Sequence, residues 1–188
     1  MSTETVHTAL LGIAKGGDDS IPLSDGLSLL RPNDQLLAYR WDWAQGKGEI
    51  EDEAKATRYL VCEYPQWLPG ETVGAAPERG ANRFYSGLMA IQVIKPIRTL
   101  GFVYRRQQIE RRPPMEPGQW AMMNKFDDAM LARVPAMIDR IQPVMDGRNV
   151  EQKNALTLLQ LGLEHFHPYI AGLLWITGLE AIFDSGGK

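Results

Sequence analysis

The sequence contains very little cysteine. Cys62 is the only one among 188 residues, which excludes a disulfide within the chain and any zinc site that needs two or four cysteines. The stretch 58–64 around it is apolar and strand-like. We therefore expect Cys62 to be an unreactive thiol in the core.

Long apolar runs and a surplus of charge of one sign are also missing. The longest apolar run, at 169–183, has 15 residues and contains Glu180, whereas a membrane-spanning helix needs about 20. The apolar stretch 9–14 is too short for a signal peptide, and no Lys or Arg precedes it. We therefore expect a cytoplasmic protein without membrane contact. The net charge of −3 argues against general nucleic-acid binding and leaves room only for a local basic patch.

Turn-forming residues are concentrated before residue 80. Pairs such as Gly16-Gly17 and Pro69-Gly70 separate short apolar segments. The segment 58–64 has residues that favour strands, and we predict a strand there. We therefore interpret 1–80 as a smaller α+β region, irregular and with short strands.

Helical periodicity dominates the rest of the chain. Apolar residues three and four positions apart predict helices at 82–95, 130–145, 149–166 and 168–184. Pro135 either kinks the second of these helices or begins a new one, and Asn149 can cap the third. His167 precedes Pro168, so one helix ends and the next begins there. We predict a mainly α protein, with a helical bundle over 81–188.

The final helix is apolar on nearly all sides, which is typical of a helix in the middle of a bundle. Only 185–188 follow it, and we expect the natural chain to continue beyond Lys188 with further helices. Glu180 is the only charge in the interior of this helix. A buried carboxylate is costly unless it is paired, so Glu180 is either part of a structural ion pair, which we favour, or a functional acid with a raised pKa.

The sequence lacks the common catalytic motifs. No Walker loop, Gly-x-Gly-x-x-Gly, His-Glu-x-x-His or Gly-x-Ser-x-Gly is present, so we nominate no catalytic residue and no cofactor. His165 and His167 would diverge by about 200° on a helix, and His7 is the only other histidine. We therefore expect a junction between helices at this point and no metal site.

Two groups of residues are candidates for binding. Four arginines within eight residues could contact phosphate groups, although a solvated connector is the commoner role of such a cluster; they are Arg105, Arg106, Arg111 and Arg112. Trp41 and Trp43 would point the same way on a strand. They could stack on a ligand, although such a pair more often packs at the edge of a core.

The C-terminal part of the chain resembles the Apea-like members of the HEPN proteins. In those proteins a central helix commonly carries the pattern apolar-Trp-x-x-x-Leu-Glu-x-Leu-Phe. The matching residues here are Trp175, Leu179, Glu180 and Phe183, with Ile182 in place of the second leucine. The resemblance implies a helical bundle, frequently dimeric, in bacterial defence, toxin or RNA-processing systems.

Many members of this family are ribonucleases whose site is an Arg-x4-6-His motif, in which His acts as acid or base and Arg steadies the phosphate. No arginine here has a histidine at that spacing; Arg148 is followed by Lys153 and Asn154 instead. The resemblance therefore implies no catalytic residue within this chain.

Three functions remain open from the sequence. The first is a non-catalytic helical interaction domain, the N-terminal part of an Apea/HEPN-like protein, which binds a protein partner or a second copy of itself, with RNA as a further partner class. The second is part of a ribonuclease whose Arg-x4-6-His motif lies beyond Lys188. The third is a small-molecule-binding domain that uses Trp41 and Trp43, which would require an apolar pocket with convergent polar groups.

Overall fold

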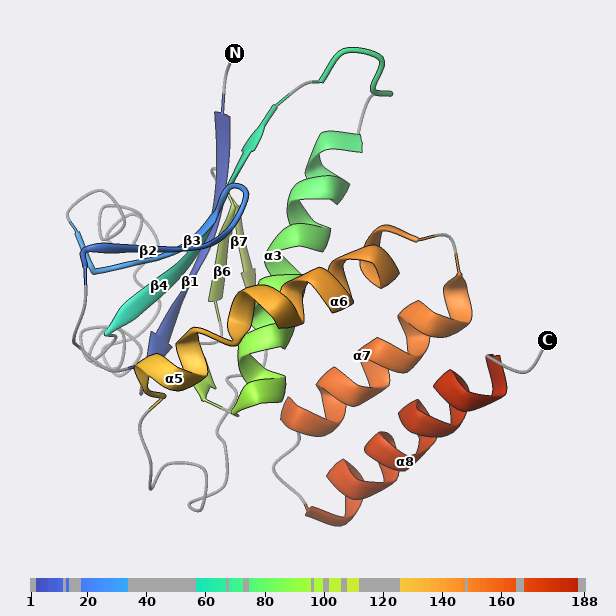
Figure 1. The fold of residues 1–188 in the computed structure, drawn as a ribbon. Helices are drawn as coiled ribbons and strands as arrows, with labels where there is room; N and C mark the ends of the chain where they lie inside the picture. Colours follow the sequence, from blue (N-terminus) through green and yellow to red (C-terminus); the bar gives the residue numbers. More distant parts are fainter. Residues whose placement is uncertain are drawn as a thin grey trace.

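A computed structural model gives the fold of the chain (Figure 1). The structure describes residues 3–11, 13, 18–33, 57–66, 68–72, 75–95, 97–99, 102–105, 108–111, 126–147, 149–164 and 168–185. The strands are β1 (Thr3–Leu11), β2 (Ser20–Ser24), β3 (Leu27–Leu30), β4 (Arg58–Pro65), β5 (Arg98–Thr99), β6 (Phe102–Arg105) and β7 (Gln108–Arg111). The helices are α3 (Ala75–Ile94), α5 (Asp128–Leu131), α6 (Val134–Asp146), α7 (Val150–Glu164) and α8 (Pro168–Ser185).

The strands form one antiparallel sheet around β1. The strand order is β2-β3-β4-β1-β6-β7, and β5 also pairs with β1. The longest pairing joins β1 to β4, with Val6 opposite Cys62 and Thr8 opposite Leu60. On the other side of β1, β6 pairs near His7 and β5 pairs at Leu10 and Leu11. The first strand of the chain is therefore the centre of the sheet.

The prediction of a mainly α protein is wrong, because the described part of the chain is an α+β fold. Three strands, β5 to β7, lie inside the part that the periodicity assigned to a helical bundle, and they join the sheet of the N-terminal strands. The expectation also missed β1, in which threonines stand between the apolar residues. Threonine is β-branched and suits a strand, but a half-polar strand becomes recognisable only when its partners cover it.

Several local predictions are confirmed. The strand predicted at 58–64 is β4, and Cys62 in it is buried. Helices α5 and α6 abut with Pro135 in the first turn of α6, so the second of the two alternatives for this proline holds. The Asn149 carboxamide oxygen accepts a hydrogen bond from the backbone of Gln152 at 3.1 Å, as an N-cap does. The last helix begins at Pro168.

The core lies between the sheet and α3. Successive residues of a strand point to opposite faces, so Val6 and Leu10 of β1 face the same way as Leu60 and Cys62 of β4. These side chains form one buried cluster with apolar residues of two helices, namely Phe84, Leu88 and Ile91 of α3 and Val134, Ile138 and Ile141 of α6. Helix α6 crosses α3 (Figure 1) and also contacts β2.

Helix α3 approaches the sheet closely at two glycines. A Cβ atom at Gly80 would overlap the ring of Tyr64, and one at Gly87 would overlap the side chain of Leu27. The two positions are seven residues apart and therefore lie on the same face of the helix. The backbone carbonyl of Gly80 also faces the Cys62 sulfur at 3.8 Å. The absence of side chains at these positions sets the distance between helix and sheet.

An ion pair holds the connection between β4 and α3. The guanidinium of Arg79 donates through Nε to Glu71 Oε1 at 2.8 Å and through Nη2 to the Pro65 carbonyl at 3.0 Å. Glu71 Oε2 in turn accepts the backbone N–H of Leu68 at 2.9 Å. The hydrogen bond from Arg79 lowers the pKa of Glu71. With this support α3 begins at Ala75 and not at the predicted Asn82.

Alanine substitutions distinguish a glycine in close contact from one in open space. We expect Gly87→Ala to lower the free energy of unfolding by about 1–3 kcal/mol, because the new methyl group overlaps Leu27. Gly172→Ala in α8 is the matched control, since a Cβ there meets no atom within 4 Å. Its stability should rise by about 0.5–1 kcal/mol through helix propensity. Urea unfolding measures both, and a neutral Gly87→Ala would contradict the close approach.

Candidate interaction surface

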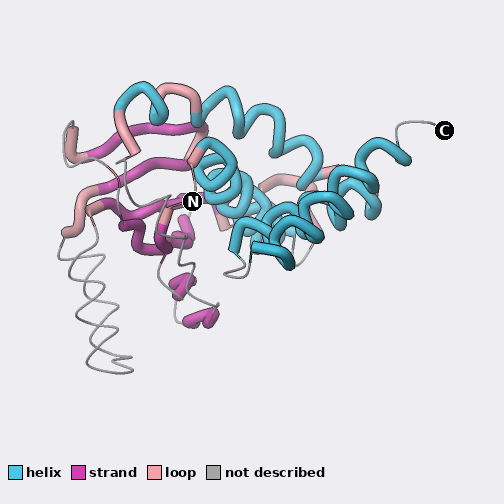
Figure 2. Tube along the Cα trace, turned by 90° about the horizontal axis from the view of Figure 1, so that it is seen from below, coloured by secondary structure: helices cyan, strands magenta, loops and turns pink. Residues whose placement is uncertain are grey.

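Helices α7 and α8 form a hairpin at the end of the molecule farthest from the sheet. Figures 1 and 2 show the helix that leads to the C-terminus lying beyond α7, away from the strands. Gly178 of α8 is buried in the seam between the two helices, where a Cβ would lie 3.0 Å from the Ala155 carbonyl and from the Leu159 side chain. The Cβ-free position therefore allows α8 to lie close to α7.

The side of α8 opposite Gly178 carries large apolar side chains that are exposed. Tyr169 is 84% exposed, Leu173 63% and Ile176 57%. At about 100° per residue these three positions form one stripe, roughly opposite Gly178 on the helix. Ile170, at 43%, flanks the stripe. We call this surface, made of Tyr169, Ile170, Leu173, Ile176 and Thr177, the α8 face.

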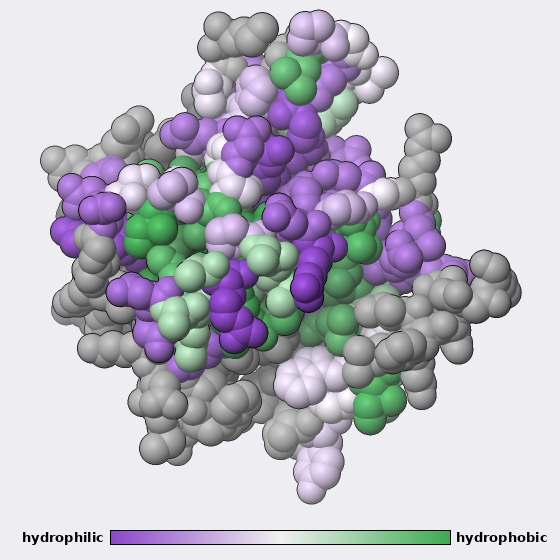
Figure 3. All heavy atoms as spheres, viewed as in Figure 1, coloured by the Kyte–Doolittle hydropathy of each residue, from purple (hydrophilic) through white to green (hydrophobic). Residues whose placement is uncertain are grey.

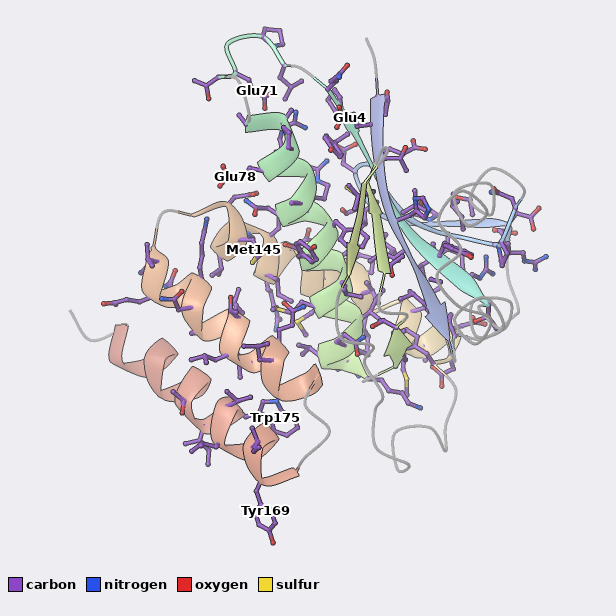
Figure 4. The ribbon with its side chains drawn as sticks, turned by 180° about the vertical axis from the view of Figure 1, so that it is seen from behind. Glu4, Glu71, Glu78, Met145, Tyr169 and Trp175 are labelled. Atoms are coloured by element: carbon purple, nitrogen blue, oxygen red, sulfur yellow. The ribbon has the colours of Figure 1, made fainter. Side chains whose placement is uncertain are left out.

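The α8 face carries no formal charge. Residues 169–178 include no Asp, Glu, Lys, Arg or His. The hydroxyl of Thr177 donates a hydrogen bond to the Leu173 carbonyl of its own helix at 3.0 Å. Because the hydroxyl already has this partner, burying it costs little free energy. Figure 4 shows Tyr169 projecting away from the body of the molecule, and in Figure 3 apolar and aromatic side chains are visible at the same lower edge. A row of exposed apolar side chains along one helix is typical of an interaction site.

The arginines proposed for phosphate binding are not gathered into one described site. Arg105 pairs with Gln108 beside the turn of the β6–β7 hairpin, whereas Arg111 pairs with Phe102 at its open end. Arg106 and Arg112 lie outside the described residues. The backbone therefore places Arg105 and Arg111 at opposite ends of the hairpin, and the structure gives no further support to a phosphate site.

The tryptophans, histidines and Glu180 that the sequence analysis singled out are not part of a described site. Trp41, Trp43, His165 and His167 lie outside the described residues. Glu180 lies in α8, where the structure describes the backbone but not this side chain. Trp175, from the family-like pattern, is 38% exposed beside the α8 face. Sequence reasoning missed the α8 face itself, because an apolar helix was expected to be covered on every side.

The sheet contains a histidine and a cysteine, two residue types that can form a catalytic pair, but their positions prevent this here. His7 on β1 is one residue from Val6, which pairs with Cys62 on β4, so the two side chains point to opposite faces. Both are buried. Burial lowers the pKa of His7 to about 4 and raises that of the Cys62 thiol to about 12. At neutral pH the histidine is uncharged and the thiol protonated, so the pair cannot supply a thiolate nucleophile with its base.

The buried arginine on β4 has a structural role. Arg58 is fully buried and donates through Nη1 to the backbone carbonyls of Asp18 at 2.7 Å and Asp19 at 3.4 Å. The Asp19 carboxylate pairs with Arg31 at 3.1 Å on the surface. Burial lowers the pKa of Arg58. This guanidinium therefore fixes the residues that lead into β2 and is not offered to a ligand.

Comparisons with known proteins give no relative. No protein-family model matches the chain, and neither the curated proteins nor the solved structures include a significant match. Among the residues that the structure describes, no group of three or more His, Cys, Asp or Glu side chains is placed to hold a metal ion. Within the same residues, no helix has the length and apolar character to cross a membrane.

The low pKa of His7 makes stability depend on pH. The folded state keeps His7 neutral down to about pH 4, whereas the unfolded chain takes up a proton below about pH 6.5. The unfolded state thus binds more protons in this window, and stability falls as the pH is lowered through it. The loss due to His7 should be about 3 kcal/mol at most, from 1.36 kcal/mol per pKa unit.

Replacement by an apolar ring tests this assignment. We expect His7→Phe to flatten the slope of unfolding free energy against pH between 6.5 and 4, measured by urea titration at several pH values. Val6→Ala is the control, because it destabilises the same strand without removing a titrating group. A His7→Phe protein that keeps the full slope would show that another group produces it.

Proposed function

We propose that this chain is a protein-interaction module in which an α+β body carries a helical hairpin with an apolar docking face. The single observation that carries the proposal is the α8 face, where large side chains are exposed on the outer side of a helix whose inner side is packed. Fully burying an exposed Leu or Ile side chain stabilises by about 1.5–3 kcal/mol, and Leu173 and Ile176 are still more than half exposed. A partner surface would recover part of this energy.

The chemistry of the face indicates what binds there. It is apolar and uncharged over 169–178, so a matching partner presents apolar side chains with few charges near the contact. A second helix suits this geometry, because the exposed positions follow the i, i+4, i+7 spacing along which helices pack. We propose binding, and no chemical reaction, as the role of the described residues.

The likeness to Apea-like HEPN proteins belongs to the same proposal. Trp175 and the pattern that follows it lie on α8, the helix that carries the face. An interaction domain of that kind, acting in the cytoplasm, fits a chain with one buried cysteine and no catalytic motif.

A polar substitution on the face tests the proposal. Leu173→Gln should change the free energy of unfolding by no more than about 0.5 kcal/mol, because the side chain is exposed in the folded chain. The same variant should bind less of the dye ANS, which reports accessible apolar surface. Both measurements are made at the lowest workable protein concentration, so that association is least.

The control is an equally exposed apolar residue away from the face. Val150, at the start of α7, is 66% exposed, and Val150→Gln should leave dye binding close to that of the original chain. If Leu173→Gln instead lost about 2–5 kcal/mol, as a core leucine does, Leu173 would belong to the core and the α8 face would not be a docking surface.

A further inference from the structure

The turn between β2 and β3 places an aspartate directly before a glycine at the surface. Ser24 pairs with Leu27, so the loop of this hairpin consists of Asp25 and Gly26 alone. Gly26 has a φ of +68°, a conformation that glycine adopts without strain, and Asp-Gly is a favoured sequence in two-residue hairpin loops. The carboxyl group of Asp25 therefore lies next to a backbone nitrogen whose own residue has no side chain to shield it.

The side chain of Asp25 is held only loosely. It is 96% exposed, and its Oδ2 lies 3.4 Å from Nη1 of Arg83 on α3. A hydrogen bond of this length is weak, and an ion pair at the surface contributes little to stability. The carboxyl group can therefore turn from the guanidinium toward the backbone nitrogen of Gly26.

The fold requires the glycine that exposes this nitrogen. The Gly26 carbonyl accepts a hydrogen bond from the backbone N–H of Glu63 on β4 at 2.7 Å. A Cβ atom at Gly26 would overlap the carbonyl oxygen of Glu63, so a larger residue would displace the hairpin from β4. The close contact between turn and strand thus retains a chemically reactive Asp-Gly pair at the surface.

We infer that Asp25 is a modification site, at which the folded chain converts spontaneously to isoaspartate. The Gly26 nitrogen attacks the carboxyl carbon of Asp25 in its protonated form, and a new C–N bond closes a succinimide ring. One carboxyl oxygen leaves as water and takes the carboxyl and amide protons. Water then adds to the main-chain carbonyl carbon of Asp25, and the bond from that carbon to the Gly26 nitrogen breaks. The product has the original mass, and its main chain runs through Cβ and Cγ of residue 25.

This conversion should loosen the hairpin from β4. It adds one backbone atom to a loop of two residues, and turn geometry sets the register of a hairpin. The hydrogen bond from Glu63 to the Gly26 carbonyl and the contact with Arg83 both depend on the original loop. We therefore expect the isomerised chain to melt at a lower temperature. The inference is independent of the α8 face.

The other Asp-Gly pair of the chain, Asp146-Gly147, is a matched internal control. Asp146 is the last residue of α6. Its Oδ1 accepts a hydrogen bond from Asn82 at 3.3 Å, and its Oδ2 accepts one from Gln142 at 2.8 Å. The local chemistry is the same as at Asp25, but both carboxyl oxygens are held by neighbouring side chains. Asp146 should therefore react more slowly.

Ageing of the whole chain at physiological temperature and near-neutral pH, followed by peptide mapping, tests the inference. Isoaspartate has an unchanged mass, a shifted elution time and resistance to endoproteinase Asp-N. It should accumulate at Asp25 at least about tenfold faster than at Asp146, because restraining a reacting group away from its target slows a reaction strongly. In concentrated urea the two sites should react at similar rates, since only their common sequence remains.

Asp25→Glu is the control variant. It keeps the carboxylate, but its longer side chain closes the corresponding ring far more slowly. The melting temperature of this variant should stay constant during ageing, whereas that of the original chain falls as isoaspartate accumulates.

Two results would contradict the inference. Equal rates at Asp25 and Asp146 in the folded chain would show that the turn does not favour the reaction. Isoaspartate at Asp25 that forms only in urea would show that the turn protects this residue. If isoaspartate forms at Asp25 and the melting temperature does not change, the expected loss of contact between the hairpin and β4 is wrong.

Discussion

The close approach of α3 to the sheet is the contact on which the rest of the structure depends. Gly80 and Gly87 let the helix backbone lie directly over Tyr64 and Leu27. The apolar side of α3 then closes the core, and α6 packs across the same helix. The α7–α8 hairpin follows α6 in the chain, so its position derives from this packing. A displaced α3 would therefore move every helix after it.

Charged and polar groups in the body mainly complete the fold. At one end of β4, Arg58 donates hydrogen bonds to backbone carbonyls. At the other end, the Glu71–Arg79 ion pair stabilises the connection to α3. His7 and Cys62 are buried on opposite faces of the sheet and held in their neutral forms near pH 7. These groups are committed to packing and hydrogen bonding. The α8 face, in contrast, is apolar and exposed, and it has no role in the packing of the sheet and α3. We therefore relate this face to binding.

A docking role follows from the contrast between the two sides of α8. One side is packed so tightly that a glycine is needed, and the other exposes a tyrosine, a leucine and an isoleucine in one stripe. Core packing and solvent exposure on the same helix are normal when the exposed side is polar. In α8 the exposed side is apolar, and a partner that covers it would remove these side chains from water.

The sequence by itself determined the local elements. Helical spacing located α6 to α8, proline and asparagine marked where helices begin, and the residues around Cys62 predicted β4. These signals act within a few residues, so they can be read along the chain. Only the tertiary structure decided that β1 is the centre of the sheet and that β5 to β7 join it, because strand pairing links positions far apart in sequence. It also decided which side of α8 is covered. When a helix is apolar on all sides, its sequence does not indicate which side is buried, because only the packing of a neighbouring helix decides this.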